Sequence, residues 1–285
     1  VMAAVVAAMV LGARLARRPN VPAEVPRKLV HVVGSLAALP FPWIFSDPRP
    51  VLLLCGLSVA LLAGLRWLPP LQRLLGGSLH AVARRSVGDM LLPLPIAGLI
   101  LLTAGRPLLY VAPIAVMALA DGAAALIGLR YGLSPYPTTE GSKSWEGSVT
   151  FFVLAAVGTL VPLLLLTDIG HGEMLLIALL VGVVGCAIEA SSWYGLDNVL
   201  VPFGVYALMR DHLDRDAASL LTELGVVVFV VLILLLWSRQ VMLDTQARFT
   251  TLLAGYFFWI VGGAPWLTPG VAVYVLSSLI VPVPE

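Results

Sequence analysis

Charge and cysteine are both scarce in this chain. Asp, Glu, Lys and Arg make up 12% of its 285 residues and leave a net charge of +1, whereas a typical soluble domain has about 25% charged residues. So few charges cannot cover a water-exposed surface or form a basic nucleic-acid-binding face, which excludes soluble, disordered and nucleic-acid-binding proteins. Two cysteines, Cys55 and Cys186, lie within apolar runs. We interpret them as small hydrophobic residues, because neither a disulfide framework nor a thiolate zinc site can be built from them.

Apolar residues are abundant instead, at 60% of the chain, and the mean hydropathy is +0.99. A helix needs about 20 apolar residues to cross a bilayer, and neither open sheet edges nor the alternating pattern of a β-barrel fits these runs. We therefore predict an all-α, polytopic membrane bundle of about ten helices, forming a single transmembrane domain over 1–285. The predicted spans lie near 1–13, 29–46, 50–68, 90–105, 107–130, 148–167, 173–191, 197–209, 220–238, 249–262 and 268–283.

Basic residues are divided unevenly between the loops that join these spans. If successive spans cross the membrane in opposite directions, the loops fall into two sets, one on each side. One set then contains 13 of the 17 Lys and Arg residues and the other contains four. Short loops rich in Lys and Arg stay in the cytoplasm. We expect a multi-pass protein of a bacterial plasma membrane, with the basic loops and any site beside them on the cytoplasmic side.

Asp121 lies inside an apolar run, where a carboxylate costs about 2.5–3.5 kcal/mol even on the lenient insertion scale. On a helix its face is shared by Met117 and by four small residues at helical spacing, so a partner helix or a ligand can approach closely. Two interpretations follow: an Asp bonded to a neighbouring helix, or a metal or proton site. The small residues are Ala118, Ala124, Ala125 and Gly128.

Three further acids lie at the ends of apolar runs. Glu189 ends one run, and the Asp197-Asn198 pair follows eight residues later, on the same predicted side of the membrane. Asp197 is explained equally well as an N-cap. Glu223 lies near the first turn of its span, where an acid favours the helix dipole.

Basic residues next to polar or small residues occur at three cytoplasmic positions. The segment 131–147 contains Lys143, one of two lysines in the chain, beside Ser144 and Gly147, which is typical of a phosphate cradle but also of an ordinary loop. Arg27 and Lys28 open a span and are explained by membrane anchoring, whereas His31, one turn further in, is not. The segment 84–89 is a similar entry to the next inner helix.

Except for Glu223, all these groups fall at the cytoplasmic ends of the predicted helices. Carboxylates, a flexible lysine and arginines are the groups used in Mg²⁺-assisted chemistry on a nucleotide phosphate. An ion-coupled transporter would place its acids nearer the midplane of the bilayer.

The motifs, taken in order, resemble the phytol kinase/dolichol kinase family over about residues 24–210. The block over 121–148 is also similar to CDP-diacylglycerol synthases, but the later Lys-Asp and Pro-Gly-His-Gly-Gly signature of those enzymes is missing here. Ala120 departs from the family's usual Gly, and 211–285 aligns with no motif and forms additional C-terminal helices. The matching residues are Arg27-Lys28-x-x-His31, Ser86-x-Gly88, Asp121-Gly122-x-Ala124-Ala125-x-x-Gly128-x-x-x-Gly132, Lys143-Ser144-x-Glu146-Gly147-Ser148, Glu189 and Gly195-x-Asp197-Asn198-x-x-x-Pro202.

The resemblance implies a kinase that transfers a phosphoryl group from CTP to a membrane isoprenoid alcohol, with no nucleic-acid partner. A CDP-diacylglycerol synthase-like cytidylyltransferase and an ion-coupled transporter remain alternatives. The implied catalytic residues are Asp121, Lys143, Glu146 and His31, with His31 as a candidate base. The implied nucleotide-binding residues are Arg27, Lys28, Lys143, Ser144, Gly122 and Asn198. Asp121, Asp197 and Glu189 are the implied Mg²⁺ ligands.

Overall fold

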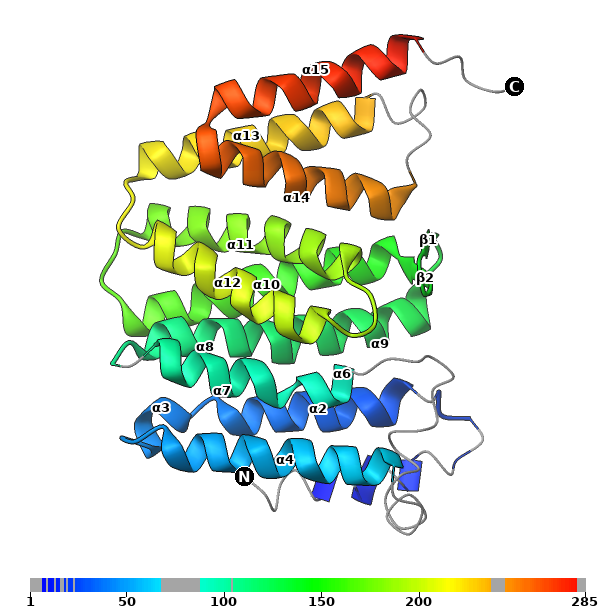
Figure 1. Ribbon diagram of the computed structural model, residues 1–285, viewed down its shortest axis with the longest axis vertical. Coiled ribbons are helices and arrows are strands. Elements are labelled where there is room, and N and C mark those ends of the chain that lie inside the picture. The colour runs from blue at the N-terminus through cyan, green and yellow to red at the C-terminus, as the bar shows by residue number, and fades with distance from the viewer. Residues whose placement is uncertain are drawn as a thin grey trace.

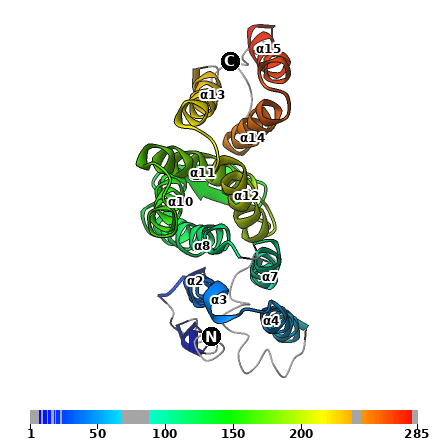
Figure 2. The same ribbon diagram turned by 90° about the vertical axis from the view of Figure 1, so that its left-hand side faces the viewer.

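The computed structural model describes residues 24–67, 88–103, 105–236 and 244–280, together with scattered residues between 7 and 22. The helices run roughly parallel or antiparallel to one another and are stacked along the longest axis of the molecule (Figure 1). Seen from the left-hand side of Figure 1, roughly along the helices, α8, α10, α11 and α12 form a central group, with α2, α3, α4 and α7 on one side and α13, α14 and α15 on the other (Figure 2).

Most predicted spans are helices with nearly the predicted bounds, so the all-α prediction is confirmed. The first predicted span, 1–13, lies largely outside the described residues. The helices on the N-terminal side are α2 (Glu24–Ala38), α3 (Phe41–Ile44), α4 (Arg49–Trp67), α6 (Gly88–Leu91) and α7 (Pro93–Leu102). The others are α8 (Pro107–Val116), α9 (Gly122–Tyr131), α10 (Trp145–Leu166), α11 (His171–Ser191), α12 (Asp197–His212), α13 (Ala217–Leu236), α14 (Thr245–Gly262) and α15 (Ala264–Ile280).

Four described helical segments are long and apolar enough to cross a membrane: Pro107–Tyr131, Trp145–Leu166, His171–Ser191 and Ala217–Leu234. Several others are apolar but shorter. The expected total of about ten crossings therefore stays a prediction.

Helix α10 illustrates how such a span is built. One face is buried at Phe151, Ala155 and Leu163, while valines at 149, 153, 157 and 161, each four residues apart, are 44–57% exposed. Residues four apart share a helix face. An apolar stripe this exposed is suited to lipid and not to water.

The segment predicted as a loop contains a β-hairpin. Strands β1 (Pro135–Thr138) and β2 (Gly141–Ser144) pair antiparallel, with Tyr136 opposite Lys143. The two-residue connection, 139–140, is followed by Gly141, the first residue of β2, whose φ of 138° favours glycine. Four-residue strands with prolines and little alternation carry no strand signal in the sequence, so this element was missed.

A π-helical turn, Met117–Asp121, joins α8 to α9 within one continuous segment. It ends at Asp121, the single acid of the predicted span 107–130. Such turns are rare and are frequent at functional sites.

Candidate functional site

The β-hairpin lies at one end of the bundle (Figure 1). A cavity of about 480 Å³ opens beside it. Seven parts of the chain contribute to it: the first turns of α2, the π-helical turn, one face of α9, the hairpin, the start of α10, the end of α11 and the start of α12. Its polar lining residues include Glu24, Arg27, Lys28, Asp121, Ser142, Lys143, Ser144, Ser148, Glu189 and Asp197.

Lys28 and Asp121 form one buried ion pair of this cavity. The Lys28 Nζ lies 2.6 Å from both carboxylate oxygens of Asp121, and the two side chains are only 5% and 8% exposed. Burying two charges is favourable only with such close pairing. Helix α2 thus supplies the cation that the sequence around Asp121 lacks.

His31 is a second partner of Asp121. Its Nε2 lies 3.2 Å from Oδ2 of Asp121 and 3.1 Å from the carbonyl oxygen of Met117, in the π-helical turn. His31 does not line the cavity. The predicted candidate base therefore contacts the cavity acid and not the cavity itself.

Lys143 and Glu189 form the second ion pair. Strand β2 carries Lys143, whose Nζ lies 2.7 Å from Oε1 of Glu189 and also donates to the Glu189 carbonyl oxygen. Burial by itself lowers the pKa of Lys143, but the negative charges of Glu189 and Asp197 outweigh it, and the pKa lies above its usual value. Lys143 is therefore a charged amine at neutral pH.

Small residues allow α9 and the start of α10 to meet at the cavity floor. A Cβ on Gly147 would lie 3.0 Å from the Ala124 carbonyl oxygen, and one on Gly132 would lie 2.9 Å from the Ser144 side chain. Ser144 is the N-cap of α10, and its Oγ accepts a hydrogen bond from the Gly147 N–H at 3.2 Å. The N-terminus of a long helix, which favours anions, is thereby brought to the cavity.

Seven of the predicted site residues line this one cavity, although up to 170 positions separate them in the chain. They are Arg27, Lys28, Asp121, Lys143, Ser144, Glu189 and Asp197.

Four predicted site residues do not line it. The carboxylate of Glu146 accepts hydrogen bonds from the Ser134 N–H at 3.1 and 3.3 Å and so fixes the entry to the hairpin. Gly122 allows α2 to pack closely against the start of α9, because a Cβ on Gly122 would lie 2.4 Å from the Val32 side chain. Asn198 is buried beside Asp197, and His31 contacts Asp121. The predicted basic pair at 84–85 lies outside the described residues.

The cavity offers carboxylate oxygens, the ligands that Mg²⁺ prefers. Within the described ranges, no three His, Cys, Asp or Glu side chains gather closely enough to form a metal site on their own. Mg²⁺ commonly takes only one or two protein carboxylates and completes its shell with phosphates and water. Asp121, Glu189 and Asp197, which share the cavity, fit that mode of binding and not a closed protein cage.

Three residues that support the site were missed from the sequence. The Tyr136 hydroxyl is 2.7 Å from Oγ of Ser148 in the cavity wall. Gln246 and Phe249 of α14 contact the hairpin or the residue that follows it. The available signal was Gln246 itself, a polar amide at the start of an apolar run, because such amides usually bond to a neighbouring helix in membrane proteins.

Comparison with known proteins shows a clear similarity to a characterised enzyme. The chain is 36% identical over 200 residues to the phytol kinase of Synechocystis sp., in a match that covers 69% of this chain and 83% of that protein. No protein-family model matches the chain, and no solved structure matches it significantly. Identity at this level, over most of the relative's length, shows common descent. The chain therefore belongs to the phytol kinase family.

Proposed function

We propose that this chain is a membrane-bound kinase that transfers the γ-phosphoryl group of CTP to the terminal hydroxyl of an isoprenoid alcohol of the phytol or polyprenol type. The relative's activity and the motif resemblance support the reaction class, and the resemblance alone supports CTP as the donor. The positive-inside distribution of Lys and Arg supports a site on the cytoplasmic face of the membrane.

One observation carries the proposal. The chain has two lysines, and both line the same cavity, each within 2.7 Å of a carboxylate. Lysine is a compact point charge on a flexible stem, well suited to phosphate. Phosphoryl transfer depends mainly on positioning and on neutralising charge, and this cavity supplies both without a covalent nucleophile.

The cavity residues divide into three proposed roles. Lys143 turns from Glu189 to the transferred phosphoryl group, while Arg27 and Lys28 face the remaining phosphates. Asp121 and Asp197, with Glu189 nearby, would hold Mg²⁺, which neutralises phosphate charge when bound. His31 keeps Asp121 in place through its 3.2 Å contact.

The bond changes follow from this arrangement. The alcohol oxygen forms a bond to the γ-phosphorus, and the bond from that phosphorus to the bridging oxygen of CDP breaks with its electron pair. The hydroxyl proton leaves late, to a cavity carboxylate, because the transition state is loose. We propose that the isoprenoid tail remains in the lipid beside α9, where Leu129 both lines the cavity and is 53% exposed.

Position-specific labels in CTP test the reaction class. Purified protein in detergent is given phytol, or phosphatidic acid, with CTP labelled at either the α- or the γ-phosphorus. We expect γ-label in the phytol product and release of CDP. Transfer of α-label to phosphatidic acid with release of pyrophosphate would establish the cytidylyltransferase instead, and absence of any transfer with CTP, UTP and ATP would contradict both enzymes.

A further inference from the structure

The geometry points to Gln246 as a positioning residue that holds the Lys143 hairpin against the end of helix α11. The inference rests on the proposed function for its kinetic consequence, but not for its structural one. Gln246 belongs to α14, outside the stretch of about 24–210 that carries the family motifs.

The amide of Gln246 bridges two segments that meet at the cavity. Its Oε1 accepts a hydrogen bond from the Thr139 N–H at 2.8 Å, at the tip of the hairpin, and its Nε2 donates to the Ser191 carbonyl oxygen at 3.3 Å. Gln246 is only 7% exposed. Ser191 lies two residues after Glu189, so a single side chain connects the segments that carry the two partners of the second ion pair.

Aromatic packing supports the same connection. Phe249, one turn after Gln246, lies with its ring centroid 6.1 Å from that of Tyr136 and 5.8 Å from that of Trp145. Aromatic pairs at these distances are stabilised beyond the burial of their area. Helix α14 therefore contacts strand β1, which pairs with the strand that carries Lys143, and it also contacts Trp145, the first residue of α10.

The hairpin needs this support. A two-stranded hairpin is marginally stable in isolation, and these strands contain four residues each. Glu140 at the tip also accepts a hydrogen bond from the Tyr194 N–H at 2.5 Å, so the tip is held from α14 and from the segment after α11. Without the Gln246 bridge, Lys143 would no longer keep a fixed position relative to Glu189.

Kinetics provide the first test. We expect Gln246→Met, which keeps the volume but removes both hydrogen bonds, to lower kcat/KM for the nucleotide about tenfold and to leave the KM for the alcohol unchanged. Gln246→Glu keeps the acceptor for Thr139 and should lose less. Thr251→Val is the matched control on the same helix, because the Thr251 hydroxyl donates to the Ala247 carbonyl within the helix, and it should behave like the wild type.

Lysine reactivity provides a test that does not depend on activity. Reductive methylation with formaldehyde and cyanoborohydride, quantified by mass spectrometry, reports separately on Lys143 and Lys28. We expect Gln246→Met to raise the methylation rate of Lys143 severalfold and to leave that of Lys28, which is held by Asp121, unchanged.

The outcomes are distinct. An unchanged ratio of Lys143 to Lys28 methylation, or an equal rise at both lysines, would overturn the positioning role. If Gln246→Met does not yield folded protein, the same comparison is made with Gln246→Glu, where we expect a smaller selective rise at Lys143. A wild-type protein that transfers no phosphoryl group would refute the proposed function, while the methylation ratio would still decide the role of Gln246.

Discussion

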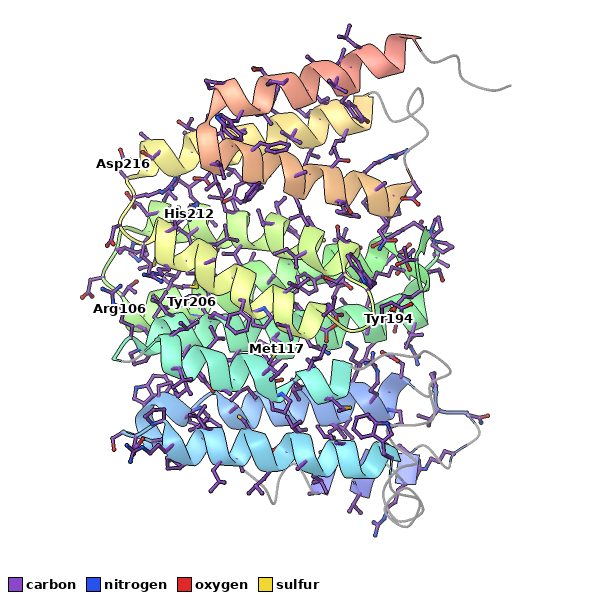
Figure 3. All side chains as sticks on the ribbon, in the orientation of Figure 1. Arg106, Met117, Tyr194, Tyr206, His212 and Asp216 are labelled. Atoms are coloured by element: carbon purple, nitrogen blue, oxygen red, sulfur yellow. The ribbon has the colours of Figure 1, made fainter. Side chains whose placement is uncertain are left out.

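At the hairpin end of the bundle, two buried carboxylates form ion pairs with lysines in the lining of a cavity, whereas at the opposite end a buried carboxylate is surrounded by hydrogen-bond donors. There Glu223, 2% exposed, accepts hydrogen bonds from Nε2 of His212 at 2.9 Å, from the Tyr256 hydroxyl at 2.6 Å and from Arg215 at 2.7 Å. Figure 3 shows His212 at the end opposite Tyr194, which lies near the hairpin. None of the Glu223 partners lines the 480 Å³ cavity.

The two ends show that burial of charge does not by itself indicate a reactive site. Both oxygens of Glu223 are used by groups from α12, α14 and the segment before α13, so this cluster joins the C-terminal helices to the bundle. At the hairpin end the partners are lysines, which can turn towards a phosphate, and open space lies beside them. We therefore propose that the chemistry takes place at the hairpin end and that the Glu223 cluster has a structural role.

The largest expected effect is the loss of Asp121. Asp121→Asn leaves Lys28 buried without its anion and removes a proposed Mg²⁺ ligand, so transfer of γ-label from CTP to phytol should fall about 10²–10³-fold. The assay compares the variant with Asp216→Asn, an exposed acid at the opposite end (Figure 3), which should retain wild-type turnover. Near-normal turnover of Asp121→Asn would remove Asp121 from the mechanism.

Replacement of Lys143 should come next. Lys143→Met removes the amine that we propose faces the transferred phosphoryl group, and we expect kcat to fall about a hundredfold. Arg106→Met, which removes an exposed cation at the opposite end (Figure 3), is the control. Equal effects of the two variants would mean that the charge of the bundle, and not the position of Lys143, determines the rate.

The comparison between the ends is tested directly at Glu223. Glu223→Gln leaves the surrounding donors with a weaker acceptor, so the free energy of unfolding should fall by about 1–3 kcal/mol. Thermal unfolding in detergent measures this loss, and kcat at a temperature where the variant is folded should equal that of the wild type. A variant that unfolds normally but transfers slowly would place function at both ends.

The smallest expected effect concerns Tyr136. Burial raises its pKa to about 12, so its hydroxyl stays protonated and bonded to Ser148 at every pH well below that value. Tyr136→Phe should lower turnover only severalfold, as expected for one neutral hydrogen bond. Because the hydroxyl does not titrate below about pH 10, the pH–rate profile should keep its shape. A shift of the alkaline limb in the variant would show that Tyr136 ionises in that range.

Much of the site was predictable because membrane insertion penalises charge. Asp121 was identified from its position in an apolar run, and the structure places it in the cavity with Arg27, Lys28, Lys143, Glu189 and Asp197. The hydrogen-bond and ion-pair partners of the buried acids were not predictable in the same way. Glu223 was explained by the helix dipole, yet its hydrogen bonds come from His212, Arg215 and Tyr256, and no local pattern specifies contacts between distant segments.

The sequence by itself determined that this is a helical membrane protein and which polar residues are costly to bury, because hydropathy and charge act over one helix at a time. Only the tertiary structure decided which lysine meets which carboxylate, that the segment with Lys143 is a hairpin, and that α14 holds it through Gln246. Those outcomes depend on the close approach of helices through glycines and on hydrogen bonds between residues far apart in the chain, which are properties of the packed bundle.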